Sequence, residues 1–215
     1  RAASAKLLSS LLISLTGTMY IYQGQELGSI NVKNWSVNDY EDVEVRNNYR
    51  ILCDKFGEDS PEVSRFKNAL PVISRDNART PIPWTSKGPT GGFSDSAEPW
   101  FKMNEVYKEG INVEDELNDP DSVLNFWKKA ISVRQENKDI LVYGYNFKFY
   151  DLDNLDYFAF TKQYDDKKFF GIFNFSGKNV EFKFPDNGKY SLFFGTHNNA
   201  DGAASTLKPW EGRLY

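Results

Sequence analysis

The chain contains little of the chemistry on which many binding sites are built. Its 215 residues include one cysteine, Cys53, and one histidine, His197. A single cysteine cannot form an internal disulfide and is typical of a reducing compartment. A single histidine excludes a metal site that takes several histidines from this chain. Internal disulfide scaffolds and multi-histidine metal centres are therefore excluded.

The chain also lacks an excess of positive charge and long apolar runs. Its formal net charge is −4, and no basic run interrupts the sequence. Binding to a phosphate backbone requires a basic surface, so the composition argues against nucleic acid as a partner. No stretch reaches 18 uninterrupted apolar residues, which a membrane-spanning helix would need. We therefore expect neither nucleic acid nor membrane among the partners.

The first residues look like a signal peptide, but their spacing favours an amphipathic helix. Apolar residues fall at positions 7, 8, 11, 12 and 15, which predicts a helix over 3–15 that Gly17 ends. The next segment, "TMYIY" (18–22), is short and rich in β-formers, as expected of a strand in a parallel sheet. Because Arg1 is not an initiator methionine, we expect the chain to begin within a domain.

Residues 29–118 form a long stretch with modest periodicity and many Asn, Asp, Gly and Pro. Long irregular excursions in compact domains usually serve a site. Two helices are predicted within this stretch, over 40–56 and 60–70. At its end, "NDPDSVLNFWKKAISVRQEN" (118–137) predicts a helix with Asp119 as its cap and Pro120 in its first turn.

The residue pattern of the sequence changes near residue 140. Aromatic-rich runs with a period of two, such as "DYFAFTKQY" and "KKFFGIFNF", alternate with the turn signals "DN", "DD" and "SGK". This pattern predicts an antiparallel sheet, arranged as a sandwich with two aromatic-lined faces. We therefore predict an α/β part followed by an all-β part.

"SRDNARTPIPW" (74–84) places two arginines and an aspartate before a rigid Pro-x-Pro-Trp turn. A guanidinium offers five donors in a fixed plane and can grip two vicinal hydroxyls or a carboxylate. Pro81 and Pro83 fix φ and stiffen the turn. The stretch is either a structural ion-pair cluster or the docking site of a polar ligand.

Four motifs together carry a family resemblance. They occur in the order "GTMYIYQGQELG", "SRDNARTPIPW", "DPDSVLNFWKKAISVRQENKDILVYG" and "FNFSGKNVEF", and the ending "LKPWEGRLY" agrees with them. In these motifs the chain resembles the C-terminal part of family 13 α-glucosidases, within the α-amylase superfamily. It is most similar to the yeast maltase and isomaltase (oligo-1,6-glucosidase) group, and the resemblance covers essentially the whole chain.

The resemblance implies the C-terminal end of a (β/α)8 TIM barrel followed by an antiparallel β-sandwich. Residues 1–139 would supply helix 7, strand 8, a long loop 8 and helix 8 of the barrel. Residues 140–215 would form the C-terminal domain. The strand, helix and sheet patterns read directly from the sequence agree with this division.

The resemblance also implies a reaction, the hydrolysis of terminal α-linked glucose from maltose-, isomaltose- or sucrose-type substrates with net retention. Retaining hydrolysis needs a carboxylate nucleophile and a carboxylic acid about 5 Å apart. In this family the catalytic Asp, Glu and Asp come from strands 4, 5 and 7, so none is expected in this chain. No cofactor is needed, and no metal site is expected here. We therefore expect the chain alone to be inactive and prone to aggregate without the missing N-terminal barrel portion.

Three residues are our candidates for substrate contact: Arg75, Glu44 and Asn48. By resemblance, Arg75 lines the −1 subsite and, together with an aspartate outside this chain, holds the terminal glucose. Glu44 and Asn48 are four residues apart, hence on one face of the predicted helix, and would contact the outgoing sugar. A pure ion-pair role for Arg75 and a solvated helix face for the other two are the alternatives.

Other polar and aromatic residues have simpler interpretations. We expect Glu26 to be satisfied by loop amides or an arginine, and Asp76 and Arg79 to form a pair that fixes their loop. Cys53 is expected to pack, and His197 to lie at the surface. Structural burial is expected for the tryptophans at positions 35, 84 and 100.

Two other function classes remain open from the sequence. One is a non-catalytic carbohydrate-binding or interaction module, favoured by the aromatic β part and the missing catalytic residues. The other is a non-enzymatic relative of the family, such as a transporter subunit. The yeast-like glucosidase interpretation further predicts a cytoplasmic location.

Overall fold

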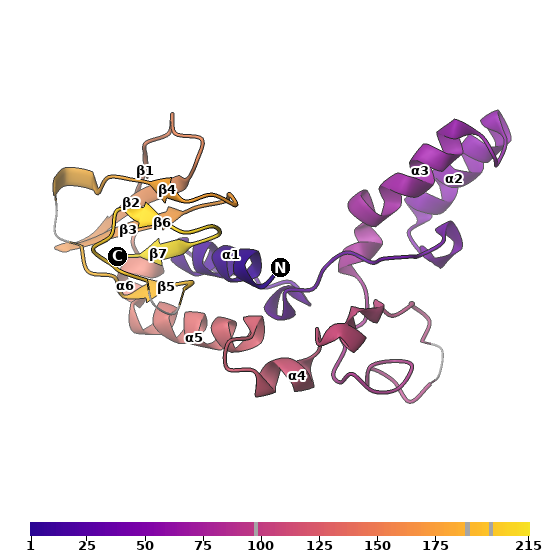
Figure 1. The fold of residues 1–215 in the computed structure, drawn as a ribbon, viewed down its shortest axis with the longest axis horizontal. Helices are drawn as coiled ribbons and strands as arrows, with labels where there is room; N and C mark the ends of the chain where they lie inside the picture. The colour runs from indigo at the N-terminus through magenta and orange to yellow at the C-terminus, as the bar shows by residue number, and fades with distance from the viewer. Residues whose placement is uncertain (97–98, 188–189, 198–199) are drawn as a thin grey trace. The chain divides into compact units, whose positions relative to one another are not determined.

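The computed structural model describes residues 1–96, 99–187, 190–197 and 200–215. The chain folds into two compact units (Figure 1). One unit comprises residues 1–21 and 125–215, and the other comprises residues 22–124. The predicted assignment of 1–139 to a barrel and 140–215 to a C-terminal domain concerns a longer protein and stays a prediction.

The first unit is built on an antiparallel sheet, as predicted for the all-β part. The order of its strands is β1-β2-β3-β7-β5, and β4 pairs with β6 in a second, two-stranded sheet. The "DD" signal forms the two-residue connection between β2 and β3, with Asp165 in the left-handed region at φ 50°, a region that Asp tolerates better than most residues. The strand bounds are β1 Asn146–Tyr150, β2 Phe158–Tyr164, β3 Lys167–Phe173, β4 Val180–Glu181, β5 Phe194–Gly195, β6 Thr206–Leu207 and β7 Gly212–Leu214, and the 3-10 helix η5 spans Pro185–Asn187.

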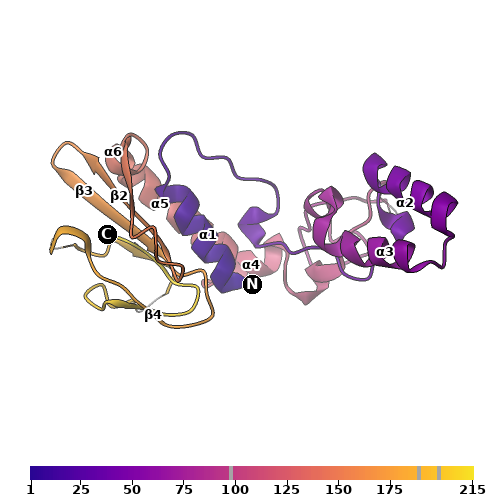
Figure 2. The same cartoon turned by 90° about the horizontal axis from the view of Figure 1, so that it is seen from above.

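The two faces of the five-stranded sheet pack against different partners. One face forms a core with the β4–β6 pair, and the buried members of this core are Tyr157, Ala159, Phe170, Ile172, Val180, Phe182, Leu207 and Tyr215. The other face packs against helices α1 (Ala2–Ser14), α5 (Val123–Glu136) and α6 (Lys138–Leu141). Figure 2 shows α1 and α5 along one side of the sheet and β4 on the other side. The predicted sandwich is therefore present, with helices as a third layer.

The packing of α1 on the sheet depends on a small residue at its closest approach. The predicted helix is present, and Leu7 and Ile13 are fully buried. The predicted apolar stripe at 7, 8, 11, 12 and 15 is only partly correct, because Leu8 is 46% and Leu15 is 37% exposed. A methyl group on Gly212 would lie 3.0 Å from the side chains of both Leu7 and Phe173. Contacts this short are tighter than those normally found in close-packed interiors, so glycine lets α1 approach β7 without displacing either side chain.

Two buried cations lie where α1 and α6 end on this face of the sheet. The guanidinium of Arg134 donates to the backbone carbonyls of Ile13, Leu15, Gly17 and Leu141. The ammonium of Lys162 donates to Leu141 O at 3.1 Å and lies 5.2 Å from the centre of the Phe169 ring. Carbonyls at a helix C-terminus carry partial negative charge, so they partly compensate two cations that have no carboxylate partner in the described chain.

The strand predicted over 18–22 does not form, and this expectation was wrong. Residues 18–22 are irregular, and Tyr20 and Tyr22 are largely exposed. A parallel strand is stabilised by hydrogen bonds to neighbouring strands on both sides, and no described segment of this chain pairs with it. The apolar pattern of 18–22 therefore has no partner here to make it a strand.

The helix predicted over 118–137 begins later, at Val123. Asp119, the predicted cap, lies four positions before this first helical residue, and its carboxylate accepts from the N–H of Asp121 in the preceding turn, at 2.9 Å. The buried carboxylate of Glu116 accepts from the N–H of Leu124, at 2.9 Å. The first turn of α5 is thus capped from α4, a long-range contact that local sequence does not reveal.

The second unit contains short helices joined by irregular segments. The helices predicted over 40–56 and 60–70 are present as α2 and α3. Two small cores hold the unit together, one around Val32, Tyr40, Val45 and Leu70 and one around Leu27, Val106 and Ile111. The element bounds are η1 Gln25–Leu27, η2 Val37–Asp39, α2 Val43–Phe56, α3 Pro61–Ile73, η3 Arg75–Ala78, η4 Glu105–Glu109 and α4 Val113–Asn118.

Candidate functional site

The candidate site lies where the start of α2 meets the end of α3. Asp42 is the N-cap of α2, and its side chain accepts from the N–H of Glu44 at 3.0 Å. Ser74 ends α3 and caps η3, with its hydroxyl accepting from the N–H of Asp76 at 3.2 Å. These local caps fix the backbone on both sides of the site, as N-cap side chains do. Asp42 and Arg75, 33 positions apart in the sequence, consequently face each other.

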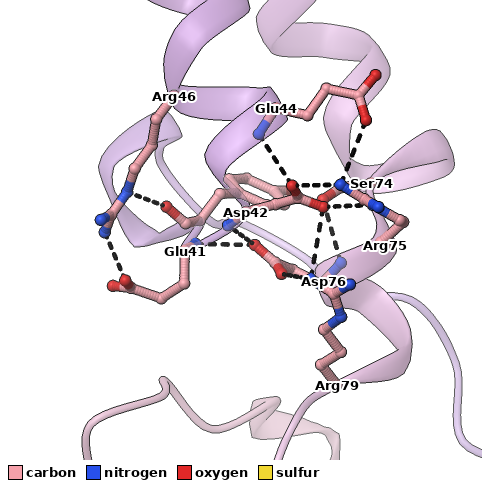
Figure 3. A network of polar contacts seen from close by, with 9 residues as sticks. Glu41, Asp42, Glu44, Arg46, Ser74, Arg75, Asp76 and Arg79 are labelled. Carbon is pink, nitrogen blue, oxygen red and sulfur yellow. Dashed lines mark hydrogen bonds and ion pairs between the residues drawn. The ribbon is translucent and has the colours of Figure 1, made fainter.

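Arg75 and Asp42 form a two-pronged ion pair (Figure 3). The guanidinium Nε donates to Oδ2 and Nη2 donates to Oδ1, each at 2.7 Å. The Asp42 side chain is only 4% exposed, whereas that of Arg75 is 60% exposed. The hydrogen bonds from Arg75 lower the pKa of the Asp42 carboxyl, and the same contact raises the pKa of Arg75. The contact therefore favours the charged form of both groups.

Arg75 keeps donor capacity that the chain does not use. Its Nη2 lies 3.3 Å from the carboxylate of Glu44, which is itself 69% exposed. Its Nη1 makes no hydrogen bond to the described part of the chain. A guanidinium anchored on one edge and open on the other is a preorganised donor for an incoming polar ligand.

The three predicted contact residues lie around one cavity of about 120 Å³. Asp42, Glu44, Asn48 and Arg75 give it a polar rim, and Val45, Phe66, Leu70 and Ile73 give it an apolar wall. Glu44 and Asn48 lie one turn apart on α2, as their spacing predicted. Hydroxyl-binding groups next to an apolar surface suit a sugar, which has both hydroxyls and C–H faces.

Asp76 and Arg79 fix the loop behind the site, as predicted. Asp76 is fully buried, and its Oδ2 accepts from the N–H groups of Glu41 and Asp42, each at 2.8 Å. Its Oδ1 lies 3.3 Å from Nη1 of Arg79, which also reaches Asp42 at 3.5 Å. Asp76 thereby ties η3 to the first residues of α2, and Arg79 compensates the two carboxylates.

Sequence reasoning missed Asp42 as the partner of Arg75. We had expected the aspartate that cooperates with Arg75 to lie outside this chain. A signal was present, because Asp42 lies near the start of the helix predicted over 40–56 and has an acid two residues on, which is typical of an N-cap. That signal predicts a cap, but the bond from a residue 33 positions away depends on the packing of α2 on α3.

A second cavity, of about 400 Å³, lies between the "QGQELG" segment and the "RDNARTPIP" turn. The amide of Gln23 links the two by donating to Thr80 O at 3.1 Å. Glu26 differs from the prediction: its buried Oε2 has no hydrogen-bond partner in the described chain, neither loop amide nor arginine. The reason is that Glu26 sits in the short 3-10 helix η1, whose backbone N–H groups are used within the turn.

The remaining expectations have mixed outcomes. Trp35 packs on Tyr40 and Phe101 as expected, but Trp84 and Trp100 are exposed, so the predicted burial was wrong for these two. Cys53 is half-buried on α2, in agreement with packing. His197 was expected at the surface, but it is half-buried, with Nδ1 3.0 Å from the Thr196 hydroxyl, and burial lowers its pKa.

Two classes of site receive no support from the described residues. No group of three or more His, Cys, Asp or Glu side chains among them is placed to hold a metal ion. Likewise, none of the helices in the described ranges is long and apolar enough to cross a membrane.

Comparison with known proteins places this chain in a family. Residues 1–144 match the family described as alpha amylase, catalytic domain. The chain is 54% identical to an oligo-1,6-glucosidase and 49% identical to an alpha-glucosidase of Saccharomyces cerevisiae. Each match covers 100% of this chain and 37% of the relative. The chain thus spans little more than a third of the length of these relatives.

Solved structures agree with the sequence relatives. A trehalulose synthase of Pseudomonas mesoacidophila superposes with a TM-score of 0.87 at 31% identity. A trehalose-6-phosphate hydrolase of Bacillus licheniformis superposes with a TM-score of 0.87 at 34% identity. Both matches cover 100% of this chain and 38% of the neighbour, and such neighbours combine a TIM barrel with a C-terminal antiparallel sheet domain. The chain belongs to the alpha-amylase family, glycoside hydrolase family 13.

Proposed function

We propose that this chain is the C-terminal part of an α-glucosidase that releases terminal α-linked glucose from maltose-, isomaltose- or sucrose-type substrates with net retention. The observation that carries the proposal is the two-pronged ion pair between Arg75 and Asp42. Asp42 anchors one edge of the Arg75 guanidinium, and the other edge stays open beside Glu44 and Asn48. Relatives named as oligo-1,6-glucosidase and alpha-glucosidase support the reaction class, and a structure of trehalulose synthase with sucrose supports the substrate class.

In this proposal Arg75 positions a glucose unit rather than reacting with it. Asp42 fixes the guanidinium plane, so binding a hydroxyl pair to the open edge costs little rotamer entropy. Asp42 itself is committed to two hydrogen bonds with Arg75 and one with the N–H of Glu44, which leaves it unsuited to act as a nucleophile. The predicted −1 subsite role of Arg75 is part of the same proposal.

Glu44 and Asn48 would contact the sugar on the leaving-group side. Both project from one face of α2 into the cavity that Arg75 borders. The exposed carboxylate of Glu44 can accept hydrogen bonds from sugar hydroxyls, and the Asn48 amide can both donate and accept them. The apolar wall opposite them would cover a C–H face of the same sugar.

The 215-residue chain alone would not hydrolyse glucosides. Retention needs two carboxyl groups about 5 Å apart across the scissile bond. By family resemblance these groups lie on barrel strands that this chain does not supply. The parent would need no cofactor, and we place it in the cytoplasm, where Cys53 of this chain would stay reduced.

The proposal is tested with a chimera. In the Saccharomyces cerevisiae oligo-1,6-glucosidase that is 54% identical, the matched segment is replaced by residues 1–215. Hydrolysis of maltose, isomaltose and a chromogenic α-glucoside is then measured for the chimera and for the isolated chain. We expect the chimera to hydrolyse at least one of them with an α-anomeric product, and the isolated chain to hydrolyse none.

Two results would contradict the proposal. A chimera with native circular dichroism and no hydrolysis would show that this segment does not complete a glucosidase. Starch or maltodextrin binding by the isolated chain with no contribution from Arg75 would favour a carbohydrate-binding module instead.

A further inference from the structure

The outer strand of the five-stranded sheet presents an aromatic face that the described residues do not fully cover. β1 is an edge strand, paired with β2 and with no other strand among the described residues. Phe149 lies opposite Phe160 in the register, and Phe147 stacks on the Phe160 ring at 4.5 Å. The ring of Phe149 is 5.0 Å from that of Phe147 and 5.9 Å from that of Phe158. We call Phe147, Phe149 and Phe158 the β1 aromatic face.

The alternation along β1 indicates that this face is meant to be buried. Asn146 and Lys148 point to one side of the strand and Phe147 and Phe149 to the other, since side chains alternate along a strand. Polar-out, apolar-in alternation is the pattern of a half-buried strand. Phe149 is nevertheless 54% exposed. An exposed aromatic row on an edge strand is a recognised aggregation risk, so folded proteins normally cover it.

Helices of the catalytic-domain match already cover the rest of this sheet surface. α1 packs on β3 and β7. α5 brings Phe126 to within 5.1 Å of Phe194 on β5, and α6 packs on β2 and β3. All three helices lie within residues 1–144, the range that matches the alpha-amylase catalytic domain. Helices of that domain therefore cover this face of the sheet from β5 to β2, and the cover ends before β1.

We propose that the β1 aromatic face is the docking surface for the remaining part of the same catalytic domain, whose apolar helix surface packs on Phe149. The proposal rests on the proposed function, in which this chain is part of a longer glucosidase. Judged by the yeast relatives, the chain would make up 37% of that protein's length. The occupant is inferred from continuity, because the covering layer consists of that domain's helices wherever it is present. Phe149 is then an interdomain anchor, while Tyr150, on the other side of β1, packs against Phe170 in the core beneath the β4–β6 pair.

Thiol labelling measures the burial of this face directly. In a Cys53→Ala background, Phe149→Cys and, as a matched control, Leu155→Cys are made in the isolated chain and in the chimera. Leu155 is 98% exposed in the loop between β1 and β2, outside the aromatic face. We expect position 149 to react roughly a hundredfold more slowly in the chimera than in the isolated chain, as for a group reached only through local opening. Position 155 should react at the same rate in both.

A second variant guards against weakened packing by the new thiol. Phe149→Asp should lower the melting temperature of the chimera and reduce self-association of the isolated chain in sedimentation, since a charge replaces an exposed ring. Leu155→Asp should change neither. Equal labelling of position 149 in both proteins, or an unchanged melting temperature for Phe149→Asp in the chimera, would overturn the proposal.

The outcomes separate this inference from the proposed function. Protection of position 149 in a chimera without hydrolysis would uphold the docking surface and contradict the glucosidase. Hydrolysis by a chimera in which position 149 is not protected would support the glucosidase and contradict the docking surface. Position 149 could instead become protected in the isolated chain as its concentration rises, and be protected in the chimera only when the chimera is a dimer. That result would assign the face to a second copy of this chain and overturn the proposal.

Discussion

Two arginines in the two units make the same bond in different surroundings. Arg213 in the sheet unit and Arg75 at the candidate site each donate from Nε to a carboxylate at 2.7 Å. The Arg213 side chain is 3% exposed and its partner Glu211 is fully buried, whereas the Arg75 side chain is 60% exposed. Geometry alone therefore does not say what an arginine–carboxylate pair is for; the use of the remaining donors does.

The donors of Arg213 are all used inside the protein. Its Nη1 donates to the carbonyls of Asp201 and Ala204, and its Nη2 donates to Thr206 O and to Glu211. Glu211 also accepts from the N–H of Lys208 at 2.6 Å. This pair closes the end of the sheet unit, while Arg75 retains an open edge. The comparison teaches that an arginine whose hydrogen-bond donors are all used within the protein belongs to a structural pair. An arginine that keeps unused donors is a candidate binding group.

The largest expected effect concerns the saturated pair. Arg213→Met removes one partner and leaves the buried Glu211 without its cation, and three backbone carbonyls lose the hydrogen bonds that Arg213 donates to them. We expect the free energy of unfolding to fall by about 3 to 5 kcal/mol, as for a broken buried ion pair. Urea unfolding followed by tryptophan fluorescence measures this, and Arg65→Met, on an exposed pair with Glu62, is the control. A loss below about 1 kcal/mol would place Arg213 with the surface pairs.

A smaller effect is expected at Lys162, a buried cation without a carboxylate. Burial, with a contribution from the charge of Arg134, lowers the pKa of Lys162 to about 7. Above that pH the unfolded chain binds a proton that the folded chain lacks, up to the ordinary lysine pKa. The free energy of unfolding should therefore rise with pH, by about 3 kcal/mol between pH 7 and about pH 9.5.

Lys162→Met tests this pH dependence. The variant should be more stable than the parent chain at neutral pH, because methionine removes the cost of burying a charge. Its stability should also change much less between pH 7 and 10. Exposed Lys168→Met, on the neighbouring strand, is the matched control. Parallel pH profiles for the Lys162→Met variant and the parent chain would show that Lys162 stays charged when folded.

The smallest stability effect is expected at the open pair. Arg75→Ala removes an exposed partner, and the Asp42 carboxylate left behind still accepts from the N–H of Glu44 and still lies 3.5 Å from Arg79. We expect a loss of about 1 kcal/mol or less, as for surface ion pairs. Differential scanning calorimetry of the isolated chain measures it. A loss as large as that of Arg213→Met would erase the distinction between the two pairs.

The sequence predicted elements that depend on local pattern and missed contacts that depend on packing. The helix at 3–15 and the antiparallel strands after 140 carry strong periodicity, and both formed. The strand at 18–22 has the right residues but no neighbour to pair with, so its pattern was insufficient. At the site, Arg75, Glu44 and Asn48 were chosen by chemistry and by resemblance. The role of Asp42 required the three-dimensional approach of α2 to η3.

The central claim is that the open edge of Arg75 binds substrate, and the kinetics of Arg75→Ala in the chimera test it most directly. We expect kcat/KM for maltose or isomaltose to fall by roughly a hundredfold or more, as when a charged hydrogen-bond donor is lost from a binding site, with an unchanged melting temperature. Arg65→Ala should leave both unchanged. An unchanged kcat/KM in the Arg75→Ala chimera would contradict the claim and assign Arg75 to structure alone.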